Sequence, residues 1–143
     1  MRRKLRRLAE LAPVEWPLFL QLAVLSVAIR VALRVVPLPR LMGGLARLAG
    51  RRWLSRIPVG HSRYAIRRLE ALVDLTVAAA PVAGRCLVRS LVLLWLLKAR
   101  GLSAELVVGI RKQAEELRGH AWIAPAGEAG GEGSEGFEAV VRF

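Results

Sequence analysis

The residues whose chemistry stands out are the single cysteine and one of the two histidines. Cys86 is the only thiol of the chain, and it follows Gly84 and Arg85 where a long apolar segment begins. His120 lies in the later segment Gly119–Ile123, whose residues suit a β-strand. A thiol at the start of a helix and an imidazole on a strand are the two groups that a thiol nucleophile and its base require. The pattern therefore indicates acyl transfer through a covalent thioester.

The expected position of Cys86 favours its thiolate form. Unpaired N–H groups and the dipole of a helix N-terminus stabilise an anion, and Arg85 and Arg89 add positive charge beside it. With His120 within hydrogen-bond reach, a thiolate–imidazolium pair forms, and the backbone N–H of Cys86 is an oxyanion donor. A structural role explains the same residues, because a lone cysteine in an apolar helix is often inert core.

Trp122 shares a strand face with His120, since side chains two residues apart point to the same side. It is expected to wall the site and shield the imidazole, although packing alone also explains it. Two histidines and one cysteine give no zinc-ligand spacing. The glycines between Gly127 and Gly136 precede a strand rather than a helix, so they do not form a phosphate-binding loop. We expect neither a metal nor a cofactor.

One helix and three strands must position these side chains. Leu87–Ala99 is apolar on nearly every face, which is typical of a buried central helix. Gly101 follows as the C′ residue, just past the end of the helix. Apolar and polar residues alternate over residues 104–111, and strand patterns recur at 120–124 and 137–143. This order predicts an α+β fold in which the central helix packs on a small antiparallel sheet.

The first half of the chain reads as helices separated by prolines. The expected segments are Met1–Ala12, Leu18–Val36, Leu41–Leu54 and Arg63–Ala79. We expect a single domain over residues 1–143, with a basic helical part at 1–60 and the catalytic core at 61–143.

Ser26, Arg30 and Arg34 follow one another at four-residue spacing and form a polar stripe on the second of these helices. The favoured interpretation is a helix packed on the domain with this stripe in solvent. The alternative is a helix that lies on a membrane surface. The uncharged part, Trp16–Ile29, has fourteen residues, which is short for crossing a bilayer.

The net charge of +12 is confined to the first part of the chain. Residues 1–85 hold 16 Lys and Arg against 4 Asp and Glu, whereas residues 86–143 hold 7 of each. An acidic partner, whether peptide, lipid headgroup or nucleic acid, should therefore meet the first part. Without an aromatic platform or a recognised motif, we expect no nucleic-acid partner. One cysteine and no visible secretory signal favour a cytoplasmic location, with peripheral membrane contact as the alternative.

Four short motifs occur in a fixed order along the second half. They are Cys-Leu-Val-Arg-Ser-Leu at 86–91, Lys-Ala-Arg-Gly-Leu at 98–102, Leu-Val-Val-Gly-Ile-Arg at 106–111 and His-Ala-Trp-Ile at 120–123. The pattern resembles the leader peptidase of lasso-peptide biosynthesis, the B protein, in its discrete form without a leader-binding domain. That family belongs to the transglutaminase-like cysteine peptidases. The resemblance covers residues 63–123.

The resemblance implies a papain- or transglutaminase-like core and a cysteine peptidase. Cys86 would attack the peptide bond that joins leader to core in a ribosomally synthesised lasso-peptide precursor, and His120 would protonate the departing amine. The implied partners are the precursor peptide, a separate leader-binding protein, and the ATP-dependent lasso cyclase that closes the macrolactam.

The chain departs from the family at the third catalytic position. The family usually has an aspartate after the histidine, but no aspartate follows Asp74 here. Family spacing points to Glu132, with Glu135 reachable if the loop is longer. A hairpin flanked by Ala124 and Phe137 would instead leave no carboxylate facing His120. The rival function is a non-catalytic, basic membrane-surface or adaptor protein in which the thiol is packing.

Overall fold

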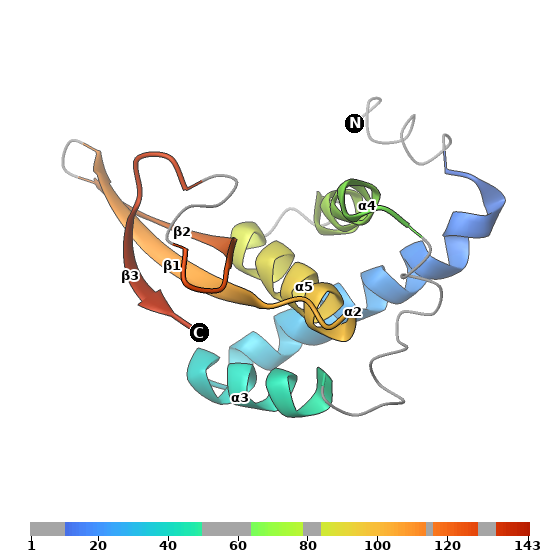
Figure 1. Cartoon of the computed structure of the whole chain (residues 1–143), viewed down its shortest axis with the longest axis horizontal. Coiled ribbons are helices and arrows are strands. Elements are labelled where there is room, and N and C mark those ends of the chain that lie inside the picture. Colours follow the sequence, from blue (N-terminus) through green and yellow to red (C-terminus); the bar gives the residue numbers. More distant parts are fainter. Residues whose placement is uncertain (1–10, 50–63, 79–83, 114–115, 129–133) are drawn as a thin grey trace.

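The computed structural model describes residues 11–49, 64–78, 84–113, 116–128 and 134–143, and it has the predicted α+β architecture (Figure 1). In chain order the elements are η1 (Pro13–Glu15), α2 (Trp16–Val35), α3 (Leu38–Ala49), α4 (Ile66–Ala78), α5 (Arg85–Ala99), β1 (Ala104–Gln113), β2 (Glu116–Pro125) and β3 (Glu138–Arg142).

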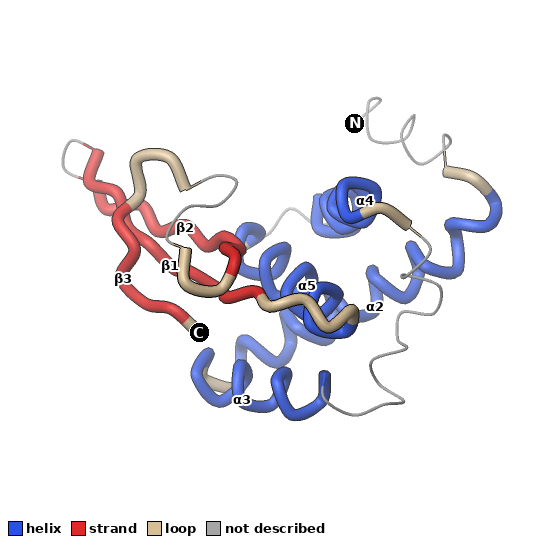
Figure 2. The backbone as a smooth tube through the Cα atoms, in the orientation of Figure 1, coloured by secondary structure: helices blue, strands red, loops and turns tan. Residues whose placement is uncertain are grey.

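The predicted central helix is α5, which lies between the sheet and the other helices (Figures 1 and 2). Eight of its residues are buried, including the run from Ser90 to Leu96. A helix that is apolar on nearly every face needs neighbours all round, and α2, α3, α4 and the sheet supply them. One hydrophobic core consequently extends from α2 to β2. The helix ends as predicted, with Gly101 in the left-handed conformation at φ 74°.

The three strands form an antiparallel sheet in the order β2-β1-β3. A hairpin between the last two strands is therefore wrong, because β1 lies between them, and His120 pairs with Gly109 rather than with Val141 or Arg142. The reason is burial. Leu106 and Val107, which point to opposite faces of β1, are both fully buried, whereas every residue of β3 is exposed. The strand that is apolar on both faces takes the centre of the sheet.

The helices of the first half differ from their predicted bounds mainly at their starts. α3 begins at Leu38, since Pro39 fits the first turn, where no backbone N–H is needed. Leu11 and Ala12 are not helical. Residues 1–10 of the predicted helix Met1–Ala12 lie outside the described residues. So do residues 50–54 of the predicted helix Leu41–Leu54.

The polar stripe on α2 does not face solvent, so that expectation is wrong for two of its three residues. Ser26 is buried with its Oγ 3.5 Å from Oγ1 of Thr76 on α4. Nη2 of Arg30 donates a 3.1 Å hydrogen bond to the carbonyl of Val77. That carbonyl lies in the last turn of α4, where helical carbonyls lack an internal partner. The stripe is therefore drawn inward, and Arg34 alone is exposed.

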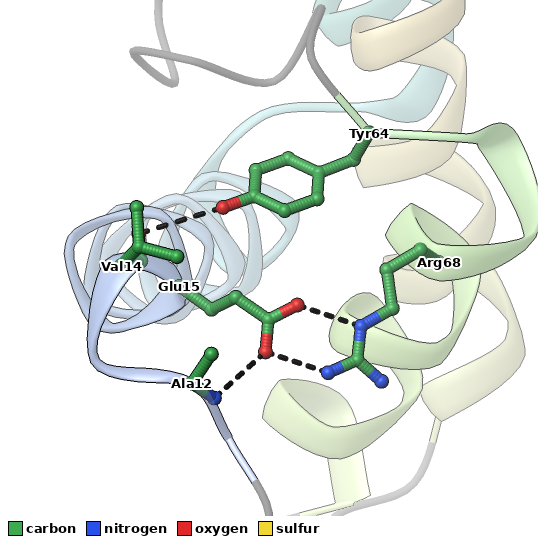
Figure 3. Close-up of polar contacts among 5 residues, drawn as sticks. All are labelled: Ala12, Val14, Glu15, Tyr64 and Arg68. Carbon is green, nitrogen blue, oxygen red and sulfur yellow. Dashed lines mark hydrogen bonds and ion pairs between the residues drawn. The ribbon is translucent and has the colours of Figure 1, made fainter.

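A buried carboxylate ties the start of α2 to α4 (Figure 3). Glu15 accepts hydrogen bonds from Nε and Nη2 of Arg68, at 2.7 and 2.6 Å, and from the backbone N–H of Ala12 at 3.0 Å. The Arg68 hydrogen bonds lower the pKa of Glu15 against the opposing effect of burial. The Tyr64 hydroxyl adds a contact to the carbonyl of Val14.

Candidate active site

Cys86 is the second residue of α5, as its position after a glycine predicted. Gly84 precedes the helix in the left-handed conformation, at φ 78°, and it carries no side chain that could cap the first turn. Cys86 is half-buried at this point. The thiol therefore lies at a helix N-terminus without a side-chain cap, where backbone N–H groups remain available to a ligand.

α5 covers the open edge of β2. Leu106 exchanges both backbone hydrogen bonds with Phe143, at 3.0 Å each, so its N–H and C=O groups point toward β3. Alternation along β1 then directs Val107 to its partner Trp122, and the carbonyl of Ala121 points away from β1. Oγ of Ser90 donates a 3.0 Å hydrogen bond to this carbonyl. The Ser90 hydroxyl thus provides a hydrogen-bond partner for one carbonyl of the edge strand that the sheet leaves unpaired.

The same contact places the start of α5 beside the histidine strand. Cys86 lies one turn before Ser90, on the same face of the helix, and His120 immediately precedes Ala121. Arg89 acts electrostatically on His120, which agrees with this proximity. Within the described part of the chain, however, no hydrogen bond joins Sγ of Cys86 to the imidazole. The two elements meet, but their reactive groups are not hydrogen-bonded to each other.

His120 lies instead among aromatic side chains. Its ring is stacked with Trp122 at 6.2 Å between centroids, which confirms that the two residues share a strand face. Phe137 approaches the imidazole more closely, at 5.0 Å. Burial lowers the pKa of His120, and the positive charges of Arg89 and Arg111 lower it further. These effects favour the neutral imidazole over the imidazolium.

Two further residues build this aromatic face, Gly109 and Phe137, and the sequence patterns did not single them out. A Cβ on Gly109 would lie 2.6 Å from both the carbonyl oxygen of Glu138 and Cη2 of Trp122. The glycine thus lets the indole lie against β1, and a glycine inside an alternating strand was the available signal. Phe137 packs on the same face, and the guanidinium of Arg111 lies 4.7 Å from the centre of its ring. No local pattern paired Phe137 with His120.

The third catalytic group remains a prediction. Glu132 lies outside the described residues, and Glu135 is exposed. No carboxylate within the described ranges hydrogen-bonds to His120. Asp74 of α4 forms an ion pair with Arg89, so it partly neutralises the positive charge one turn into α5. In the same part of the chain, no group of three His, Cys, Asp or Glu side chains is arranged to hold a metal ion.

Comparison with known protein families assigns most of the chain to one superfamily. Residues 32–142 match the transglutaminase-like superfamily, and the match includes Cys86, His120 and every element from α3 to β3. The chain therefore belongs to that superfamily, whose members often have cysteine peptidase activity. No curated protein and no solved structure matches the chain.

Proposed function

We propose that the protein is a cysteine peptidase that removes the leader from a ribosomally synthesised lasso-peptide precursor. The observation that carries the proposal is the position of Cys86, half-buried at the uncapped start of α5 and beside the strand of His120. Membership of the transglutaminase-like superfamily supports the peptidase class. The four ordered motifs between residues 86 and 123 support the narrower assignment to lasso-peptide maturation.

The proposed reaction follows the chemistry of thiol peptidases. His120 accepts the proton of Cys86, and the thiolate attacks the carbonyl carbon at the end of the leader. The backbone N–H of Cys86 stabilises the oxyanion. The C–N bond then breaks as the imidazolium gives its proton to the amine of the core peptide, which leaves the leader as a thioester on Cys86. Water, deprotonated by His120, hydrolyses the thioester and restores the thiol.

This reaction requires the imidazole to move. The His120 ring packs on Phe137, at 5.0 Å between ring centroids, on the face of β2 that also carries Trp122, whereas Ala121 of the same strand packs in the core with α5. Catalytic hydrogen bonds are often formed only in the substrate complex. We infer that the bound precursor draws the imidazole from the aromatic face toward the start of α5.

The proposed partners are those that the chemistry of maturation requires. The precursor peptide is the substrate, a separate leader-binding protein presents it, and the ATP-dependent lasso cyclase uses the freed amine of the core. The first part of the chain, with its excess of arginine, offers a surface for an acidic segment of any of these.

Cleavage of the cognate precursor in the presence of its leader-binding protein tests the proposal. Mass spectrometry of the released leader and core should show that Cys86→Ala lowers the rate by at least ~10³-fold. His120→Gln should lower it by ~10²-fold or more. Circular dichroism should show both variants folded. Full activity of folded Cys86→Ala would reject the peptidase and favour the non-catalytic alternative.

Two matched substitutions test the third catalytic position. We propose that Glu132 orients the imidazole, so Glu132→Gln should lower the cleavage rate and change its dependence on pH. Glu135→Gln, in the same acidic segment, is the control and should cleave at the rate of the unsubstituted protein. If Glu132→Gln also cleaves at the rate of the unsubstituted protein, Glu132 is not part of the site.

A further inference from the structure

The outward face of α2 carries a continuous row of exposed apolar side chains. The row consists of Trp16, Leu20, Val24, Val27, Val31 and Val35. Spacings of three and four residues keep these side chains on one side of the helix, and the row extends over the whole of its 20 residues. Val24 is 69% exposed and Val35 is 76% exposed. We call this row the α2 apolar face.

A soluble chain rarely leaves an apolar strip of this length in water, and such a strip usually marks an interaction surface. Among the described residues, Pro13–Val35 is the one helix long and apolar enough to cross a membrane, judged by length and composition alone. Of its most apolar stretch, 28% is buried within the protein. Packing on the domain therefore explains one side of α2 and leaves the other side unexplained.

The buried side of α2 determines how the helix can meet a bilayer. Leu18, Leu22 and Ile29 belong to the main core. The Arg30 side chain is also hydrogen-bonded to α4. A spanning orientation would remove all of these contacts. An orientation with the helix axis in the plane of the membrane keeps them and immerses only the α2 apolar face.

The charge of this part of the sequence, together with two exposed arginines near Val35, selects the kind of surface. Residues 16–69 contain ten arginines and no aspartate or glutamate. Arg34 is exposed on α2 itself, and Arg40 is exposed at the start of α3, near the end of the row at Val35. Two copies of the chain facing each other here would bring like charges together, whereas anionic headgroups complement them. Trp16, at the other end, suits the boundary between headgroups and acyl chains.

We propose that α2 docks the protein on an anionic phospholipid bilayer, with the helix axis in the membrane plane. The α2 apolar face enters the headgroup boundary, and Arg34 and Arg40 contact the phosphates. The docking involves neither Cys86 nor His120, and it therefore stands apart from the proposed peptidase activity. It would hold the thiol at a membrane surface.

Co-flotation of the full chain with vesicles tests the docking. The vesicles contain phosphatidylcholine and phosphatidylglycerol at three to one, and pure phosphatidylcholine vesicles are the comparison. A triple variant with Val24→Gln, Val27→Gln and Val31→Gln should bind the anionic vesicles at least ~10-fold more weakly. Glutamine is a better helix former than valine, so α2 should stay intact. Arg34→Gln should weaken binding about fivefold.

The matched control places glutamines on exposed apolar residues elsewhere. Leu117 and Val140 are 70% and 56% exposed on β2 and β3. Leu117→Gln with Val140→Gln should bind vesicles as the unsubstituted protein does, and so should Cys86→Ala. Absence of binding to anionic vesicles, or equal binding by the triple variant, would overturn the proposal. Loss of a dimer in the triple variant, measured by sedimentation and without vesicle binding, would instead assign the face to a second copy of the chain.

Discussion

α5 and α2 are both strongly apolar helices, yet the protein buries them very differently. Eight residues of the 15-residue α5 are buried, against five residues of the 20-residue α2. α5 has helices on one side and the sheet on the other, while the elements described around α2 contact it on one side only. Apolar composition therefore indicates that a helix avoids water, but its neighbours decide which faces are actually covered.

The two helices turn polar residues inward in the same way. On α5, Ser90 turns inward to the open edge of β2. On α2, Ser26 and Arg30 turn inward to α4, which leaves valines outside. In each case a backbone carbonyl or hydroxyl of a neighbouring element forms a hydrogen bond with the polar group inside the protein. The position of such a partner, rather than the polarity of the residue, decides the direction.

The sharpest test of this difference is core truncation. Leu91 on α5 and Leu22 on the inner side of α2 are both fully buried. Leu91→Ala and Leu22→Ala should each lower the free energy of unfolding by ~2–5 kcal/mol. Val24→Ala, on the outer side of α2, should change it by less than ~0.5 kcal/mol. Urea unfolding measures all three, and a large loss for Val24→Ala would show that the outer side is covered.

The sheet provides a second comparison, because no helix among the described residues covers its outer face and aromatic side chains cover it instead. Trp122 covers β1 there only because Gly109 has no side chain. Gly109→Ala should lower the free energy of unfolding by ~1–3 kcal/mol, since the indole and the strand must separate. The near-ultraviolet signal of tryptophan should change with it. Gly119→Ala, where a Cβ meets nothing within 4 Å, is the control and should have a smaller effect.

The link between η1 and α4 tests what keeps α2 on the domain at its first turn. Glu15→Gln keeps the shape of the side chain but removes the charge that Arg68 and the N–H of Ala12 contact. The expected loss is ~1–2 kcal/mol in the free energy of unfolding. Glu128→Gln, an exposed carboxylate, should have no measurable effect. Equal stability of Glu15→Gln would mean that α2 is held by its apolar contacts alone.

The smallest expected effects are those of pH on stability. They distinguish the sheet, which carries His120, from the start of α2, which carries Glu15. The pKa of His120 is lowered, so unfolding takes up a proton, and stability should fall as the pH drops below the ordinary histidine value of about 6.5. The pKa of Glu15 is also lowered, so its share of stability is lost only below the ordinary glutamate value of about 4.3. Between pH 7 and 5, the unfolding temperature of His120→Gln should therefore change less with pH than that of the unsubstituted protein. An unchanged slope would contradict the burial of the imidazole.

Local patterns predicted the parts of the fold that depend on local physics. Periodicity gave α5 and the three strands, although β2 begins at Glu116 and not at His120. The break that ends at Gly84 gave the start of α5. The two-residue repeat placed His120 and Trp122 on one face. The order of the strands was not predictable, because it depends on how β1, β2 and β3 share burial over long sequence distances. For the same reason no pattern placed Phe137 against His120.

The orientation of α2 was mispredicted for a related reason. Three polar residues at helical spacing normally mark the solvent side, but here α4 offers them partners that only the tertiary structure reveals. Glu132, assigned from the family resemblance, lies outside the described residues and stays a prediction.

The proposed reaction requires the sulfur of Cys86 to carry the leader during cleavage. Intact-protein mass spectrometry after acid quench, early in the reaction with the cognate precursor, measures this directly. We expect a species heavier by the leader acyl group, located on Cys86 by fragmentation and missing from Cys86→Ala, which should release no core peptide. Release of the core peptide by Cys86→Ala at the rate of the unsubstituted protein would show that the thiol does not carry the leader.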